Sequence, residues 1–342
     1  MQLNTILLTA INAVFPIILL IVLGYFLKSR NLFTQEFVKD GNNFVFKVGL
    51  PCMLFINVYN IESFSAIRWD LIGYVMAVIV VIFILGCVTA IFTTKVPERR
   101  GVIWQCSFRS NFAIIGLTLA GALGGDTATG VAAVISAFTI PVFNIMGVIA
   151  LTIFMNNSED LSKSIKNIII NIFKNPLIIG VVLGGICLCI RTWQINTFGE
   201  VVFSLERDVK FLYSAINNLK SLTTPLALIV LGGQFEFSAI KELMKDIVVG
   251  TIWRIVITPL IGIGGAVLVS QYTNLLSCGP NEYPALIALF GSPVAVSSAV
   301  MADSMGNDKQ LAAQLVVWTS ICSIVTIFLT VCVLMAFGLL SI

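Results

Sequence analysis

The chain has 342 residues, of which 58% are hydrophobic and 11% are charged, and its formal net charge is +3 with no histidine. An ordinary soluble domain carries about 25% charged residues, so this composition excludes a water-soluble globular protein. The small net charge also speaks against a nucleic-acid partner, which needs a clustered basic surface. A membrane span takes about 20 apolar residues, which leaves room for about ten spans and little else.

Apolar runs along the chain predict an all-α polytopic membrane protein with ten transmembrane helices. The first run has no basic segment before it and carries Lys28 and Arg30 after it, which favours an uncleaved span over a signal peptide. The cysteines lie mostly inside these runs and are predicted to be buried thiols rather than disulfides. The runs are 7–27, 39–59, 70–93, 102–123, 128–154, 174–192, 211–232, 247–269, 283–304 and 310–338.

Lysine and arginine are divided unequally between the two sets of connections. The set that includes 155–173 carries twelve of them, and the other set carries four. Basic connections remain in the cytoplasm, so this asymmetry predicts a protein of the plasma (inner) membrane with both termini outside.

An internal repeat divides the ten spans into two groups of five. Pro16–Gly24 and Pro176–Gly184 are identical at five of nine positions, and Asn111–Asp126 aligns with Pro293–Asp308. Leu50-Pro51 pairs more loosely with Thr224-Pro225. Because five is odd, the second copy enters the bilayer from the opposite side, an inverted repeat typical of secondary transporters. The predicted parts are a first repeat (1–155), a cytoplasmic connection (156–173) and a second repeat (174–342).

Spans four and nine carry small and polar residues near their middles, at matching positions of the two repeats. Such interruptions mark broken helices, which membranes tolerate only inside protein or at a water-lined cavity. Two broken helices that cross would aim half-helix N-termini at a common point, and those N–H groups favour an anion. The predicted substrate-binding residues are Arg109, Asn111, Gly116, Thr118, Asn144, Ser292, Pro293, Ser297 and Ser298.

Three stretches resemble the auxin efflux carrier family. The first is Asn43-Phe-Val-Phe-Lys-Val-Gly-Leu-Pro51-Cys-Met-Leu-Phe55, and the second is Arg109-Ser-Asn111 followed by Gly116-Leu. The third is Pro293-Val-Ala-Val-Ser with Gly306-Asn-Asp-Lys-Gln-Leu-Ala-Ala-Gln314. The short connection between the repeats is similar to that of the bacterial malate or malonate permease branch, which is related to plant PIN transporters and to the bile-acid transporter fold.

The resemblance implies ten helices in two inverted repeats, with helices four and nine crossing at the substrate. It also implies that helices 3–5 and 8–10 slide, as an elevator, against a scaffold of helices 1, 2, 6 and 7, and that the protein is a homodimer. The family pattern Gly-Leu-Pro in span four is Gly116-Leu117-Thr118 here. We therefore expect the break to rest on Gly116 and Asn111.

Each charged candidate has a structural alternative. Arg109 would pair with a substrate carboxylate, or it would extend to the cytoplasmic headgroups. Arg254 and Lys47 pose the same question, and Arg254 could instead brace a neighbouring helix. Asp303 could carry a coupling proton or cation, or it could mark the extracellular boundary. Asp126 and Asp308 are predicted to be helix N-caps.

The polar candidates could contact the substrate or bond neighbouring helices to one another. The sequence contains no nucleotide-binding, serine-hydrolase or zinc-hydrolase motif, so we expect no enzyme, cofactor or metal. We predict a secondary transporter of a small organic anion, a mono- or dicarboxylate. The alternatives are a sodium-coupled organic anion symporter and a non-transporting ligand sensor, which would dock a partner through 155–173.

Overall fold

The computed structural model describes residues 2–60, 68–155 and 176–340, and throughout these ranges the secondary structure is helical, without a strand. Five helical runs are long and apolar enough to cross a membrane: 69–93, 127–153, 176–198, 237–272 and 309–336. The predicted connection 156–173 and the docking segment 155–173 lie outside the described residues, apart from position 155. The chain is thus an all-α protein with multiple apolar helices, as its composition predicts.

In the first half, each predicted span coincides with helical structure. Two short π-helical turns, η1 (Val45–Gly49) and η2 (Phe112–Gly116), lie beside proline or polar positions. Predicted spans four and five are separated at Gly124 and Gly125, whose backbones leave the helix inside α6, with Gly125 at φ 67°. The helices are α1 (Gln2–Ser29), α2 (Gln35–Phe44), α3 (Leu50–Tyr59), α4 (Trp69–Thr93), α5 (Pro97–Phe108) and α6 (Leu117–Ile153).

The second half also consists of helices joined by short turns. The helices are α8 (Pro176–Phe198), α9 (Leu205–Asp208), α10 (Lys210–Gln234), α11 (Ile240–Ile252), α12 (Gly265–Tyr272), α13 (Glu282–Leu286), α14 (Val296–Ser304) and α15 (Lys309–Ala336). Short turns η3 (Phe237–Ala239), η4 (Trp253–Ile257), η5 (Leu260–Gly264) and η6 (Ile287–Gly291) extend or join them. The predicted span 283–304 is therefore interrupted between Gly291 and Val296.

Two close helix pairs are built on glycine. α1 packs along α10, where a Cβ on Gly24 would lie 2.0 Å from the Ile229 carbonyl oxygen. α8 packs along α3, where a Cβ on Gly184 would lie 2.8 Å from the Phe55 carbonyl oxygen. These two glycines end the matching sequence segments, so both copies of the repeat motif use glycine to approach a helix of the other half.

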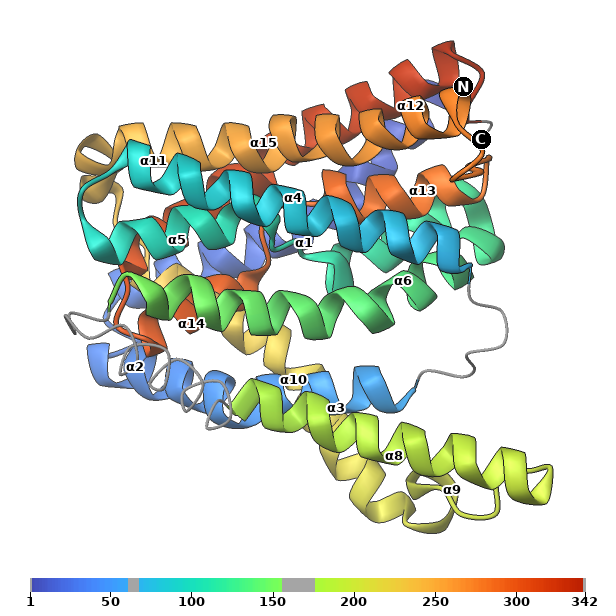
Figure 1. Ribbon diagram of the computed structural model, residues 1–342. Coiled ribbons are helices and arrows are strands. Elements are labelled where there is room, and N and C mark those ends of the chain that lie inside the picture. The colour runs from blue at the N-terminus through green and yellow to red at the C-terminus, as the bar shows by residue number, and fades with distance from the viewer. Residues whose placement is uncertain (1, 61–67, 156–175, 341–342) are drawn as a thin grey trace, which may run out of the picture.

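The helices gather into two groups (Figure 1). α3, α8 and α10 lie together on one side of the molecule, and α4, α5, α11 and α15 lie on the other. Within the second group, Arg99 of α5 pairs with Asp308 at 3.0 Å, with Asp246 at 3.6 Å and with Glu242. Asp308 also accepts a hydrogen bond from the Leu311 amide at 2.9 Å, so it caps α15 as the sequence predicts.

Candidate substrate site

The two interrupted spans meet at their breaks. The backbone N–H of Asn111 donates to the Pro293 carbonyl at 2.9 Å, and the backbone N–H of Ala295 donates to the Arg109 carbonyl at 3.1 Å. These bonds form a short antiparallel bridge in which Ser110 lies opposite Val294. The backbone groups that lose their helical partners at the two breaks therefore hydrogen-bond to one another. This pairing avoids the free-energy cost of unpaired backbone groups in an apolar interior.

A pocket lies beside this bridge, with a volume of about 50 Å³, enough for a group the size of a few waters or one carboxylate. The chain resumes helical structure at Phe112 and Val296, next to the pocket residues Asn111 and Ala295. The first amides of a helix lack intrahelical acceptors and carry partial positive charge. The lining residues are Leu50, Met53, Leu54, Arg109, Ser110, Asn111, Ile140, Phe143, Asn144, Thr223, Thr224, Ala227, Ala295, Val296 and Ser297.

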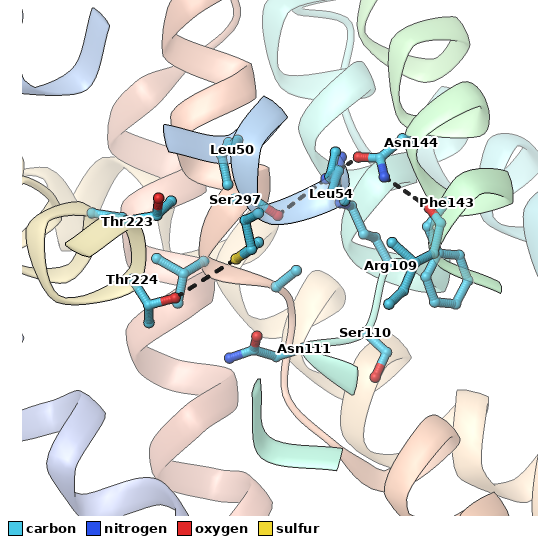
Figure 2. Close-up of a pocket in the computed structure, with 15 residues that line it drawn as sticks. Leu50, Leu54, Arg109, Ser110, Asn111, Phe143, Asn144, Thr223, Thr224 and Ser297 are labelled. Carbon is cyan, nitrogen blue, oxygen red and sulfur yellow. Dashed lines mark hydrogen bonds between the residues drawn. The ribbon is translucent and has the colours of Figure 1, made fainter. Parts of the chain in front are cut away.

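Arg109 is the one charged residue in this lining. Its side chain is 4% exposed, and its Nη2 donates to Asn144 Oδ1 at 2.8 Å and to Ser297 Oγ at 3.0 Å. Figure 2 shows the guanidinium reaching toward Asn144 and Ser297. Nη1 contacts Met301 Sδ, and it donates at 3.0 Å to Gln105 when the amide of Gln105 turns its oxygen toward it.

All of these partners of Arg109 are neutral, and the ion pairs in the described part of the chain do not include it. A buried cation held only by neutral groups retains an attraction for an anion. The guanidinium is thus held by inner side chains, an arrangement that favours a carboxylate partner over extension to the headgroups.

Asn111 brings a hydrogen-bond donor to the same pocket. Its side chain is 3% exposed, and its Nδ2 has no hydrogen-bond partner among the described residues. The hydroxyl of Ser110 likewise lacks a partner. Buried donors are normally satisfied, so two unpaired polar groups beside a cation indicate a place where a ligand completes the bonding.

Four of the predicted site residues line the pocket together: Arg109, Asn111, Asn144 and Ser297. Ser292 and Ser298 do not line it. The Ser292 hydroxyl donates to the Ala288 carbonyl at 2.6 Å, and the buried Ser298 hydroxyl has no partner within the described part of the chain. Pro293 takes part through its carbonyl, which accepts the Asn111 amide.

The expectation that Gly116 forms part of the break is wrong. Gly116 has helical angles, φ −63° and ψ −48°, and the chain leaves the helix at Arg109–Asn111 instead. Gly116 is required by packing, because a Cβ there would lie 2.2 Å from the ring of Phe112. Thr118 belongs to α6, and its side chain lies outside the described part of the structure.

Asp303 lies away from the crossover, in a second cavity of about 630 Å³. It accepts a hydrogen bond from Gln234 Nε2 at 2.8 Å, and Lys28, Lys39 and Lys309 line the same cavity. These lysines belong to connections that the charge asymmetry assigns to the cytoplasm. Asp303 therefore lies on the same side of the molecule as these lysines, so the charge asymmetry and the alternative of an extracellular boundary predict opposite sides for it.

Sequence reasoning missed the wall of the pocket that α3 and α10 supply. Leu50, Met53 and Leu54 come from the start of α3, and Thr223, Thr224 and Ala227 come from α10. The loose match between Leu50-Pro51 and Thr224-Pro225 was the available signal, since Leu50 and Thr224 occupy related positions and both line the pocket.

Comparison with known proteins identifies the family of the chain. A family profile described as "Membrane transport protein" matches residues 9–331. A search of curated proteins gives no match.

Proposed function

The chain belongs to the membrane transport protein family, the family of the auxin efflux carriers, and on that premise we propose that it is a secondary transporter of a small organic anion. The observation that carries the proposal is the buried charge of Arg109, which faces the crossover pocket with neutral partners only. A carboxylate would supply the missing negative charge and accept hydrogen bonds from the unpaired side-chain Nδ2 of Asn111.

In the proposed binding mode, a carboxylate lies between Arg109 and Asn111, near the N-termini at Phe112 and Val296. The two N-termini add about half a positive charge each. The opposite wall is mainly apolar, through Leu50, Leu54 and Ala227, and it would contact the body of the anion.

For the fold, the proposal is ten crossing helices in two inverted repeats (1–155 and 174–342). Three observations support it. The ten predicted spans all coincide with helical segments in the described ranges, and the two breaks pair with each other. Both ends of the described chain lie at the same end of the molecule (Figure 1), as an even number of crossings requires.

For the mechanism, the proposal is an elevator-like slide. The pocket lies between two groups of helices: α3 and α10 form one wall, and the crossover forms the other. A slide of spans 3–5 and 8–10 would carry Arg109 and Asn111 with the anion, while Leu50 and Thr224 stay with the scaffold. A homodimer in the plasma membrane, with both termini outside, completes the proposal.

Uptake into proteoliposomes tests the function. The wild-type protein is assayed with radiolabelled acetate, benzoate, indole-3-acetate, malonate and malate. We expect saturable uptake of at least one anion, and strong loss of that uptake in Asn111→Ala and in Pro293→Ala, with both variants folded and inserted. Normal uptake by both variants would place the substrate elsewhere.

The same preparation separates the alternatives. A sodium-coupled symporter would lose uptake when a large organic cation replaces sodium. The lining of the crossover pocket contains no acidic residue, so we expect uptake to persist without sodium. A ligand sensor would bind an anion in a thermal-shift assay and move none of it.

A further inference from the structure

Arg254 is a second buried arginine, and it is not part of the pocket lining. It belongs to the π-helical turn η4, and its side chain is 0% exposed. The guanidinium donates only to backbone carbonyls: Nε to Ser292 at 2.9 Å, Nη2 to Leu289 and Phe290 at 3.0 and 3.1 Å, and Nη1 to Ser107 at 3.4 Å. One side chain thus binds both broken spans at once.

The carbonyls that Arg254 binds lie where the first halves of the two broken spans end. Ser107 lies in the last turn of α5, and Leu289 and Phe290 lie in the last turn of η6. Each helix C-terminus carries about half a negative charge, so the two together are matched by one guanidinium. The two helix C-termini therefore balance the charge of Arg254, whereas no negative group in the described residues balances the charge of Arg109.

The contacts of Arg254 flank the bridge that forms the pocket. Ser292 precedes Pro293, whose carbonyl accepts the Asn111 amide, and Ser107 lies two residues before Arg109. Thr258, one turn beyond Arg254, adds a second bond to the Ser107 carbonyl, at 2.8 Å. A change in these bonds would displace the ends of both half-helices and, with them, the two polar groups proposed to hold the anion.

We propose that Arg254, with Thr258, is a positioning residue for transport: it binds the C-terminal ends of both half-helices and thereby sets how Arg109 and Asn111 of span four lie relative to the Pro293–Ser297 segment of span nine. The role in transport rests on the proposed function, but the role in ordering the crossover does not. Apolar packing could fill this volume at lower desolvation cost, so the retention of a charge here fits a requirement for fixed geometry.

The test compares Arg254→Lys with the wild-type protein by hydrogen–deuterium exchange in detergent. Lysine keeps the charge, but its single ammonium cannot reach carbonyls on both spans. Loss of one bond to a charged donor corresponds to about tenfold faster opening or more, so we expect that change in segments 107–116 and 287–298. We expect no change in α1 or α8. Thr251→Val is the matched control, because the Thr251 hydroxyl lies one turn before Arg254 and has no partner among the described residues.

Unchanged exchange in Arg254→Lys would overturn the proposal, and so would an equal rise throughout the protein, which would indicate general destabilisation. If Arg254→Lys does not fold, Thr258→Val decides: faster exchange confined to 107–116 supports the proposal, and unchanged exchange refutes it.

A binding arm uses malonate and indole-3-acetate as probes, with a double-variant cycle. Acting through Asn111, Arg254→Lys should raise the Kd at least tenfold in the wild-type background and much less in Asn111→Ala. Additive effects would refute the positioning role. If the wild-type protein binds neither probe, the binding proposal fails for these anions while the exchange experiment still decides whether Arg254 orders the crossover.

Discussion

Replacement of Arg109 by glutamine removes the one charge in the crossover pocket and keeps a side chain that can hydrogen-bond. In the native site the guanidinium is 4% exposed and bonds to the neutral Asn144 and Ser297 at 2.8 and 3.0 Å. At 4 Å and an effective dielectric constant of 20, two unit charges attract by about 4 kcal/mol. This value sets the upper limit for the loss.

The net loss is smaller, because the anion also gives up hydration. A hydrogen bond to a charged group contributes about 1.5–3 kcal/mol, which corresponds to an increase in Kd or KM of about 10- to 150-fold. Arg109→Lys keeps the charge but lacks the planar guanidinium, so its increase in Kd or KM should be smaller than that of Arg109→Gln.

The assay is concentration-dependent uptake of the anion identified in proteoliposomes, together with thermal shift to measure Kd. Arg100→Gln is the control: Arg100 lies in α5, the helix that ends just before Arg109, is partly buried, and donates to the Thr94 carbonyl rather than to the pocket. An unchanged KM in Arg109→Gln, or equal losses in both variants, would refute the assignment of Arg109 as the carboxylate partner.

Three further substitutions, one of them with a matched control, test the anion site and the packing of the helices. Asn111→Ala should weaken anion binding about tenfold while changing the melting temperature little, because the Asn111 amide keeps its bond to Pro293 and the lost Nδ2 has no partner; a large fall in melting temperature would show a structural role. Gly147→Ala should also weaken binding without removing a charge, since the new Cβ would lie 2.7 Å from Arg109 Nη1; unchanged affinity would contradict the position of the guanidinium. Gly232→Ala should destabilise the fold by about 1–3 kcal/mol or more, because its Cβ would lie 1.9 Å from the Ile21 carbonyl oxygen. Its control is Gly73→Ala, where the new Cβ meets open space, and this change should be neutral or stabilising by up to about 1 kcal/mol. Thermal unfolding in detergent compares the two variants.

The helices and both breaks could be predicted because their signals are local. Apolar runs mark helical segments, and proline, glycine or small polar residues mark where a helix cannot continue. In the first break this reasoning placed Asn111 correctly and Gly116 wrongly. The pairing of the breaks followed from the internal repeat, which aligns Asn111 with Pro293, the two residues joined by a backbone hydrogen bond.

The sequence does not predict in the same way which side chains point into the pocket. Ser292 lies in the break itself, and Ser297 and Ser298 are adjacent residues of the first turn of α14, which point in directions about 100° apart. Ser297 therefore lines the pocket while Ser298 does not. The wall from α3 and α10, and the place of Asp303 at the basic end, depend on how separate helices pack together, which no local pattern specifies.

An experimental structure with a bound anion that scatters strongly, such as 4-bromobenzoate, whose aryl bromide does not alkylate the free cysteines, is the most direct test of the crossover site. We expect bromine density in the crossover pocket, with a carboxylate oxygen about 3 Å from Arg109 or Asn111. Density in the cavity lined by Lys28, Lys39 and Lys309, with an empty crossover pocket, would contradict it.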